Sequence, residues 1–179
     1  SEDILEMMSS PMINHRGPEF AELLSRTTTK LKTIFATVGD MYIITGSGTG
    51  AMEAAVVNTM SPGDKILNLS VGAFGDRFGQ IANLFGAEVT TIKFPSGTTV
   101  TLDKVREALN SDPSIKSVLV THNETSTGVT NDIESIANVV KKEFGKLLLV
   151  DGISSVASIP MLTDTWGCDV VASASQKGW

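Results

Sequence analysis

A glycine-rich turn is the first feature of the sequence that could bind a ligand. Residues 46–50 read Gly-Ser-Gly-Thr-Gly and lead directly into a predicted helix. Glycines let the backbone approach a ligand closely, and the free N–H groups and dipole of a helix start attract anions. The hydroxyls of Ser47 and Thr49 add further donors. The turn therefore predicts a phosphate-binding site, although a merely tight connection has a similar composition.

Two ionisable residues follow later apolar runs. Asp151 ends the run Leu147–Asp151, where a carboxylate would lose much of its hydration. It would persist only beside a positive or hydrogen-bonding partner, for which a protonated pyridine nitrogen and a structural arginine are the candidates. Lys177 follows residues 169–173 among small side chains, where partial desolvation would favour the neutral amine as a nucleophile or base. Taken alone, a lysine after a strand is usually a surface charge.

Two further segments with chemical potential follow other apolar runs. Phe74 lies between Gly72 and Gly75 on a predicted loop, where it would either cover an aromatic ring or pack into the core. Residues 121–128 read Thr-His-Asn-Glu-Thr-Ser-Thr-Gly, and so many polar groups after a buried strand must find hydrogen-bond partners. A lone histidine such as His122 is more often structural than catalytic. Because the two histidines lack cysteines or carboxylates at ligand spacing, the sequence predicts no metal site.

The elements that must position these residues alternate along the chain. Apolar, β-branched runs predict strands at residues 41–45, 65–70, 88–94, 117–121, 147–151 and 169–173. Amphipathic or capped stretches predict helices at residues 19–35, 51–60, 77–85, 102–109 and 133–144. Strands separated by helices pair in parallel through right-handed crossovers. We therefore predict an α/β fold with an open, mainly parallel sheet and helices on both faces, which binds ligands at the carboxyl ends of its strands.

Placed on that edge, the four features form one set. They are a phosphate cradle at residues 46–50, an aromatic lid at Phe74, a buried acid at Asp151 and an amine at Lys177. Pyridoxal 5′-phosphate (PLP) requires a Schiff-base lysine, an acidic partner for its ring nitrogen and an anchor for its phosphate. The set therefore predicts PLP as the cofactor.

The composition limits the partners and the compartment. A formal charge of −6 without a lysine or arginine stripe argues against nucleic acid as a partner. The 41% hydrophobic and 19% charged contents are those of an ordered globular protein. Because the apolar runs are too short to span a membrane and the start does not resemble a signal peptide, we expect a cytoplasmic protein. Cys168, the single cysteine, cannot form an internal disulfide and is expected to pack in the core.

The sequence is similar over essentially its whole length to a known family. Six ordered segments carry the similarity, at residues 14–20, 46–54, 72–78, 121–129, 150–155 and 173–177. They resemble the class V aminotransferases of PLP fold type I, and within these the alanine–glyoxylate and serine–pyruvate aminotransferase group. The resemblance implies transfer of an amino group from a small amino acid, such as alanine or serine, to a 2-oxo acid, such as glyoxylate or pyruvate. It also implies a homodimer.

The resemblance implies a role for each matching residue that acts in the chemistry. Lys177 would bind the cofactor covalently and move the proton between the substrate Cα and the cofactor C4′. Asp151 would pair with the pyridine nitrogen and keep it protonated. His122 and Asn123 would contact the residues that bind the cofactor, without touching the cofactor themselves.

A second set of matching residues would hold the cofactor in place. Phe74 would stack on the ring, where many relatives have tryptophan, and Ile153 would cover the opposite face. Thr125 would donate a hydrogen bond near the phenolic oxygen. The phosphate would be held by Ser47, Gly48, Thr49 and Gln176.

The ends of the sequence predict a partial protein. Residues 176–179 follow the last predicted strand directly, and the first predicted helix has no element before it. The family's glycine-rich start, its arginine for the substrate carboxylate and its C-terminal small domain have no counterpart here. We therefore expect residues 1–179 to be a single PLP-binding large domain, truncated after the cofactor lysine, with little or no turnover by itself.

Three other interpretations are weaker. The glycine turn fits the loose dinucleotide pattern of an oxidoreductase, but the next strand ends at Ser70 without the acidic residue that this pattern expects. A lyase or a cysteine desulfurase of the same fold type would share the cofactor residues, although Cys168 is placed for packing. A non-catalytic assembly piece would need neither the lysine nor the aspartate.

Overall fold

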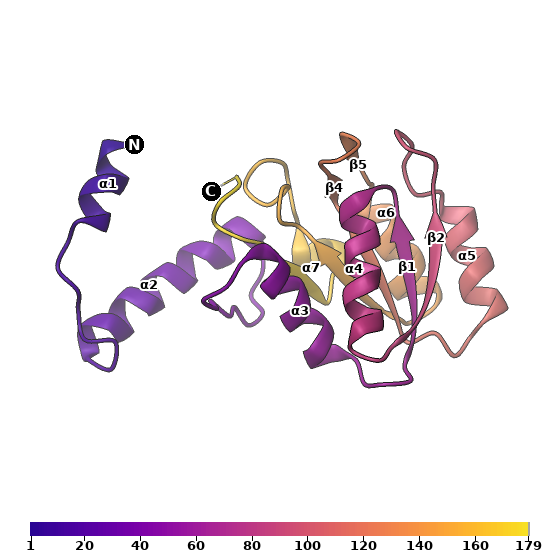
Figure 1. Ribbon diagram of the computed structural model, residues 1–179, viewed down its shortest axis with the longest axis horizontal. Helices are drawn as coiled ribbons and strands as arrows, with labels where there is room; N and C mark the ends of the chain where they lie inside the picture. Colours follow the sequence, from indigo (N-terminus) through magenta and orange to yellow (C-terminus); the bar gives the residue numbers. More distant parts are fainter. Residues whose placement is uncertain (179) are drawn as a thin grey trace.

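The computed structural model describes residues 1–178, so the predicted end of the domain at Trp179 lies outside the described residues. The main sheet consists of β1 (Lys65–Ser70), β2 (Glu88–Lys93), β3 (Ser117–Thr121), β6 (Leu147–Asp151) and β7 (Val170–Ala172). A small hairpin pairs β4 (Asn123–Glu124) with β5 (Val129–Thr130). The helices are α1 (Glu2–Met8), α2 (Pro18–Phe35), α3 (Gly48–Thr59), α4 (Ala73–Leu84), α5 (Leu102–Ser111), α6 (Ile133–Ala137), the π-helix η1 (Asn138–Glu143) and α7 (Thr163–Trp166). Figure 1 shows this order along the chain.

The five main strands form one parallel sheet in the order β2–β1–β3–β6–β7. The sequences of these strands are apolar and rich in β-branched residues. Every residue of β3 is buried, as expected for a strand covered on both faces. From β1 the chain first adds β2 on one side and then β3 on the other. Such a reversal opens a crevice at the carboxyl ends of β1 and β3, where open α/β sheets bind ligands. The predicted fold class is confirmed.

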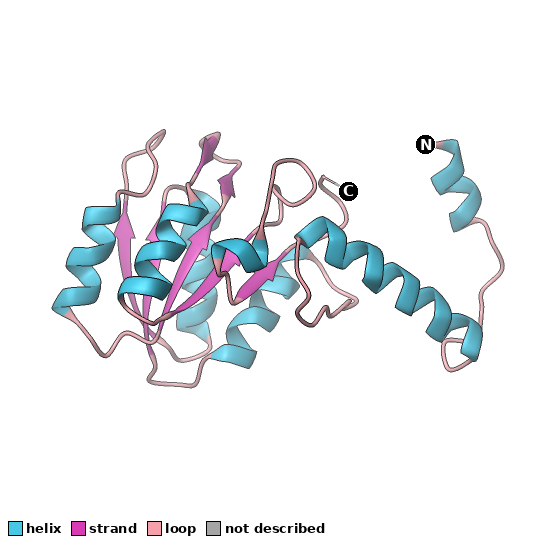
Figure 2. Cartoon of the chain, turned by 180° about the vertical axis from the view of Figure 1, so that it is seen from behind, coloured by secondary structure: helices cyan, strands magenta, loops and turns pink. Residues whose placement is uncertain are grey.

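Helices cover both faces of this sheet, as Figures 1 and 2 show from opposite sides. Phe78 of α4 packs on one face with Leu119 of β3, while Ile136 of α6 packs on the other face with Val118 and Val120. Successive strand residues point to opposite faces, so each strand contributes to both apolar layers. Burial of these two layers holds the edge of the sheet in a fixed geometry.

The N-terminal part of the chain extends away from the sheet (Figure 1). Helix α2, which begins at Pro18, is present where predicted, but only Leu31 and Phe35 near its end are buried. Helix α1 has no buried residue and was not predicted. Within the described residues, no helix is both long and apolar enough to cross a membrane.

Two helices begin earlier than the sequence predicts. Both α3 and α4 start about one turn before the predicted residues 51 and 77. Glycine has low helix propensity, so the local pattern places these starts too late. Packing requires the glycine at Gly75, because a Cβ there would lie 2.9 Å from the Cα of Ser70 on β1. Phe74 therefore lies in the first turn of α4, and the prediction that it lies on a loop is wrong.

The strand predicted at residues 41–45 is absent, and this prediction is wrong. The segment pairs with no strand among residues 1–178. Tyr42 is 80% exposed and Ile43 is 50% exposed, so the segment is not part of the packed sheet. β-Branched residues favour extended backbone, but a strand also needs a neighbour to take its hydrogen bonds. The other predicted elements are present, with ends that differ by one or two residues.

Candidate active site

Polar residues gather at the carboxyl edge of the sheet, where β1, β3, β6 and β7 end. This edge holds Thr121 at the end of β3, Asp151 at the end of β6, and residues 173–177 after β7. In the sheet register, Asp151 lies between Thr121 and Ala172. The acid predicted from the sequence therefore lies at the end of the strand next to β7, the strand that leads to Lys177.

Asp151 is a buried carboxylate, only 3% exposed. The N–H of Ile153 donates to its Oδ1 at 3.0 Å, and the hydroxyl of Thr121 donates to its Oδ2 at 3.4 Å. Burial raises the pKa of Asp151 to about 6, although both hydrogen bonds act to lower it. No lysine or arginine among the described residues forms an ion pair with it. A cation brought to this carboxylate would hold it ionised.

The glycine turn at residues 46–50 lies against Ile153, two residues after Asp151. Ser47 caps α3, since its Oγ accepts the N–H of Gly50 at 3.2 Å. A Cβ on Gly48 would lie 2.8 Å from the Cδ1 of Ile153, so the turn packs tightly against the loop that follows β6. Because the N–H of Ile153 also binds Asp151, the positive end of the α3 dipole and the buried acid belong to one contact chain.

A groove of about 610 Å³ joins the glycine turn to the segment after β7. Gly46, Ser47, Ser173 and Gln176 line it together with residues of α2, α3 and β7, whereas Asp151, Phe74 and Lys177 do not. Lys177 follows Gln176, and its side chain is exposed. The partial desolvation predicted for Lys177 is therefore not found, because none of the described elements covers this end of the edge.

The backbone around Lys177 is held against the loop that follows β6. The hydroxyl of Ser173 donates to the carbonyl of Gly152 at 3.2 Å. On the other side of the lysine, a Cβ on Gly178 would lie 2.6 Å from the carbonyl oxygen of Val156, so only glycine fits. Both contacts hold the backbone on either side of Lys177 against the loop that follows Asp151.

Phe74, the predicted aromatic lid, is half-buried in the first turn of α4. The guanidinium of Arg77 lies 5.1 Å from its ring centroid, which is within the range of a cation–π contact. The backbone N–H of Phe74 donates to the carboxylate of Glu124 at 3.1 Å. The sequence analysis did not single out Glu124, although it lies in the polar run 121–128. Its complete burial, rare for a glutamate, is visible only in the structure.

The polar run after β3 is hydrogen-bonded, as predicted. Asn123 and Ser154 bind each other, with the amide of Asn123 donating to Ser154 Oγ at 2.9 Å and Oγ donating to the carbonyl of Asn123 at 2.8 Å. The hydroxyl of Thr127 donates to the carbonyl of Val71 at 3.2 Å. These bonds tie the hairpin to its neighbours and leave Thr125 exposed in the turn between β4 and β5.

His122 is buried and Cys168 is half-buried, and both groups titrate far from neutral pH. Burial lowers the pKa of His122 to about 4, and its ring meets that of Trp166 edge to face at 5.8 Å between centroids. Within the described residues the Nδ1 of His122 has no hydrogen-bond partner. Burial raises the pKa of the Cys168 thiol to about 12. Both groups are therefore neutral near pH 7 and serve packing.

The predicted site residues lie at the start of α3 and at or after the carboxyl ends of β1, β3, β6 and β7. They are Ser47, Gly48, Thr49, Phe74, Thr125, Asp151, Ile153, Gln176 and Lys177. The edge thus combines a helix N-terminus, a buried acid, an aromatic ring and an amine. In the part of the chain that the structure describes, no three His, Cys, Asp or Glu side chains gather as a metal site would require.

The fold and the edge together define a domain of the aminotransferase class. An alanine–glyoxylate aminotransferase from Nostoc sp. superposes on the structure with a TM-score of 0.94 and 35% sequence identity. The match covers 99% of this chain and 47% of that one.

The chain belongs to the class V aminotransferase family, whose model matches residues 4–179. An L-aspartate–glyoxylate aminotransferase of Paracoccus denitrificans is 36% identical, over 99% of this chain and 46% of that protein. A protein of Synechococcus sp. named soluble hydrogenase, small subunit, is 38% identical, over 99% of this chain and 47% of its own length. The chain therefore spans about half the length of the curated relatives it matches. The family expected from the sequence is confirmed.

Proposed function

We propose that this chain is the PLP-binding large domain of an aminotransferase. The enzyme would move an amino group between a small amino acid, such as alanine or serine, and a 2-oxo acid, such as glyoxylate or pyruvate. One observation carries the proposal: the buried carboxylate of Asp151 is in contact, through Ile153, with the start of helix α3. Family membership and the names of the similar aminotransferases support the reaction and glyoxylate as an acceptor.

The described residues fit PLP at both of its charged ends. Asp151 would meet the ring nitrogen, because a pyridinium is the cation that its carboxylate needs to ionise in a buried place. Ser47, Gly48 and Thr49 would bind the phosphate at the N-terminus of α3, together with Gln176, which lines the same groove as Ser47. When bound, PLP supplies an electron-withdrawing pyridinium that stabilises negative charge at the substrate Cα.

The remaining residues would orient the ring and move protons. The amine of Lys177 would hold the cofactor covalently and would serve as the base that takes a proton from the substrate Cα. Phe74 and Ile153 would bound the ring on its two faces and exclude water. The hydroxyl of Thr125 would donate to the phenolic oxygen.

We include a homodimer in the cytoplasm in the proposal. Helix α1 lies apart from the sheet (Figure 1). Four of its large apolar side chains are exposed, which supports their burial against a second copy. They are Ile4, Leu5, Met7 and Met8. The family's small domain and a substrate-binding arginine would complete the site.

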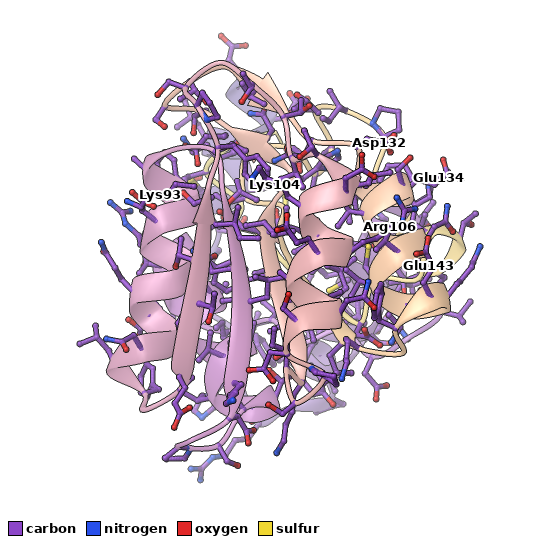
Figure 3. The ribbon with its side chains drawn as sticks, turned by 90° about the vertical axis from the view of Figure 1, so that its right-hand side faces the viewer. Lys93, Lys104, Arg106, Asp132, Glu134 and Glu143 are labelled. Atoms are coloured by element: carbon purple, nitrogen blue, oxygen red, sulfur yellow. The ribbon has the colours of Figure 1, made fainter. Side chains whose placement is uncertain are left out.

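Covalent labelling of the full-length protein tests the proposal. Reduction with borohydride in the presence of PLP should fix the cofactor on Lys177, as found by peptide mapping. The Lys177→Ala variant should bind PLP loosely, show no label and lose amino-group exchange between alanine and glyoxylate. The Lys104→Ala variant, which changes an exposed lysine of α5 (Figure 3), should label and react like the wild type. A label on another lysine, or labelling that survives Lys177→Ala, would refute the assignment.

A further inference from the structure

Helix α4 begins without a capping side chain of its own. Its N-cap residue is Gly72, which has no side chain to offer to the free N–H groups of the first turn. A Cβ on Gly72 would lie 2.6 Å from the Cγ of Glu124 and 2.5 Å from the Oγ of Ser126. These two side chains, which come from the β4–β5 hairpin, occupy the position of the cap. The cap of α4 is therefore supplied by a distant segment of the chain.

Glu124 and Ser126 bind three consecutive amides of the first turn of α4. The carboxylate of Glu124 accepts the N–H of Phe74 at 3.1 Å and that of Gly75 at 2.9 Å. Ser126 Oγ accepts the N–H of Ala73 at 3.0 Å. Ser126 then donates its own N–H and its hydroxyl to Glu124, at 3.2 Å and 2.6 Å. The helix dipole also favours a carboxylate at this end.

This arrangement is more demanding than an ordinary helix cap. Glu124 is fully buried, and it forms no ion pair with any described residue. Burying a carboxylate is costly, whereas a serine or aspartate at the N-cap position would satisfy the same amides near the surface. The buried carboxylate does one thing that a local cap cannot. It links the start of α4, which carries Phe74, to the hairpin turn that carries Thr125.

We infer that Glu124 is a positioning residue of the active site, which fixes Phe74 and Thr125 relative to each other so that both contact the bound cofactor ring. The inference rests on the proposed function, since the two residues are paired by their expected contacts with PLP. Glu124 acts through the backbone: it holds the N–H of Phe74 and directly precedes Thr125 in the chain. Side-chain direction follows backbone direction, so a shift at either segment moves a ring contact.

The test measures PLP affinity and amide exchange in the full-length protein. Glu124→Gln keeps the size of the side chain but turns an NH₂ group toward backbone N–H donors. It should weaken PLP binding roughly 3- to 10-fold, the range expected for losing an aromatic contact. It should also speed hydrogen exchange at the amides of residues 73–75 in the apoprotein. In a Phe74→Ala background, the effect of Glu124→Gln on PLP affinity should become smaller, because the part that acts through the Phe74 ring is already lost.

Asp132→Ala is the matched control. Asp132 caps α6 by accepting the N–H of Ser135 at 3.0 Å, and Figure 3 shows it at the start of that helix. Its loss should lower the melting temperature but leave PLP affinity unchanged. If Glu124→Gln behaves like Asp132→Ala, or if its effect persists in full without the Phe74 ring, Glu124 is only a structural cap and the inference is wrong.

Two further measurements keep the test decisive. If Glu124→Gln does not fold, Ser126→Ala removes one link of the same network and should weaken PLP binding about 2- to 3-fold; an unchanged affinity would then overturn the inference. If the wild type binds no PLP, the proposed function fails. Amide exchange at residues 73–75 would still show whether Glu124 holds the start of α4.

Discussion

Asp151→Asn is the substitution that tests the electrostatics of the site most directly. In the folded apoprotein, burial raises the pKa of Asp151 from its ordinary value of 3.8 to about 6. The folded state therefore binds this proton more tightly than the unfolded state does. Stability from this group is complete below pH 3.8 and is lost as the pH rises to about 6. Above that pH the apoprotein carries a buried negative charge without a partner.

The size of the effect follows from the two pKa values. At about 1.4 kcal/mol for each pH unit, the change from 3.8 to about 6 corresponds to roughly 3 kcal/mol. Asparagine has nearly the same shape, can still accept the N–H of Ile153 and has no charge to bury. We compare the free energy of unfolding of the Asp151→Asn apoprotein with that of the wild type. The difference should be near zero at pH 4 and should reach roughly 3 kcal/mol in favour of the variant above pH 6.5.

Urea unfolding of both full-length apoproteins between pH 4 and pH 8 measures this difference. The comparison is needed because other carboxylates act in the opposite direction. Hydrogen bonds from Lys93 and Ser135, for example, keep the pKa values of Asp76 and Asp132 below their ordinary value. The contribution of these two carboxylates to the stability of the fold therefore decreases as the pH falls. Such contributions are common to both proteins and cancel. A difference that does not change with pH would refute the claim that Asp151 is held in a desolvated place.

The other predictions concern packing and the surface. Gly48→Ala should displace Ile153 and cost about 1–3 kcal/mol of stability, with weaker PLP binding by titration. Gly46→Ala, whose new methyl group meets nothing within 4 Å, should change neither stability nor PLP binding. Equal effects of the two variants would contradict the tight packing of Gly48 against Ile153. Arg106 of α5 binds Glu143 of η1 through two hydrogen bonds of 2.8 Å (Figure 3). Because this pair is largely solvated, Arg106→Ala should lower the melting temperature only slightly and leave PLP affinity unchanged, which a thermal scan and a titration would check.

Local features of the sequence were enough to predict most of the fold. Apolar, β-branched runs identify the buried strands, such as Lys65–Ser70 and Ser117–Thr121, because a strand covered on both faces needs little else. The order of strands and helices then fixes a parallel sheet, and the polar residues after the strands mark its carboxyl edge. Asp151 was identified in this way, whereas the glycine turn was identified by its glycines before a predicted helix; the structure connects the two through Ile153.

The tertiary structure decided what depends on partners distant in the sequence. Residues 41–45 have the composition of a strand but no neighbouring strand to pair with among the described residues. The segment is therefore not packed in the sheet, and Tyr42 is exposed. The start of α4 lies at Ala73 because its cap comes from Glu124, about fifty residues away, and no local pattern contains that cap. The pKa of Asp151 likewise depends on burial by several elements at once. Composition and spacing act over a few residues, whereas caps, strand partners and desolvation are set by the folded chain as a whole.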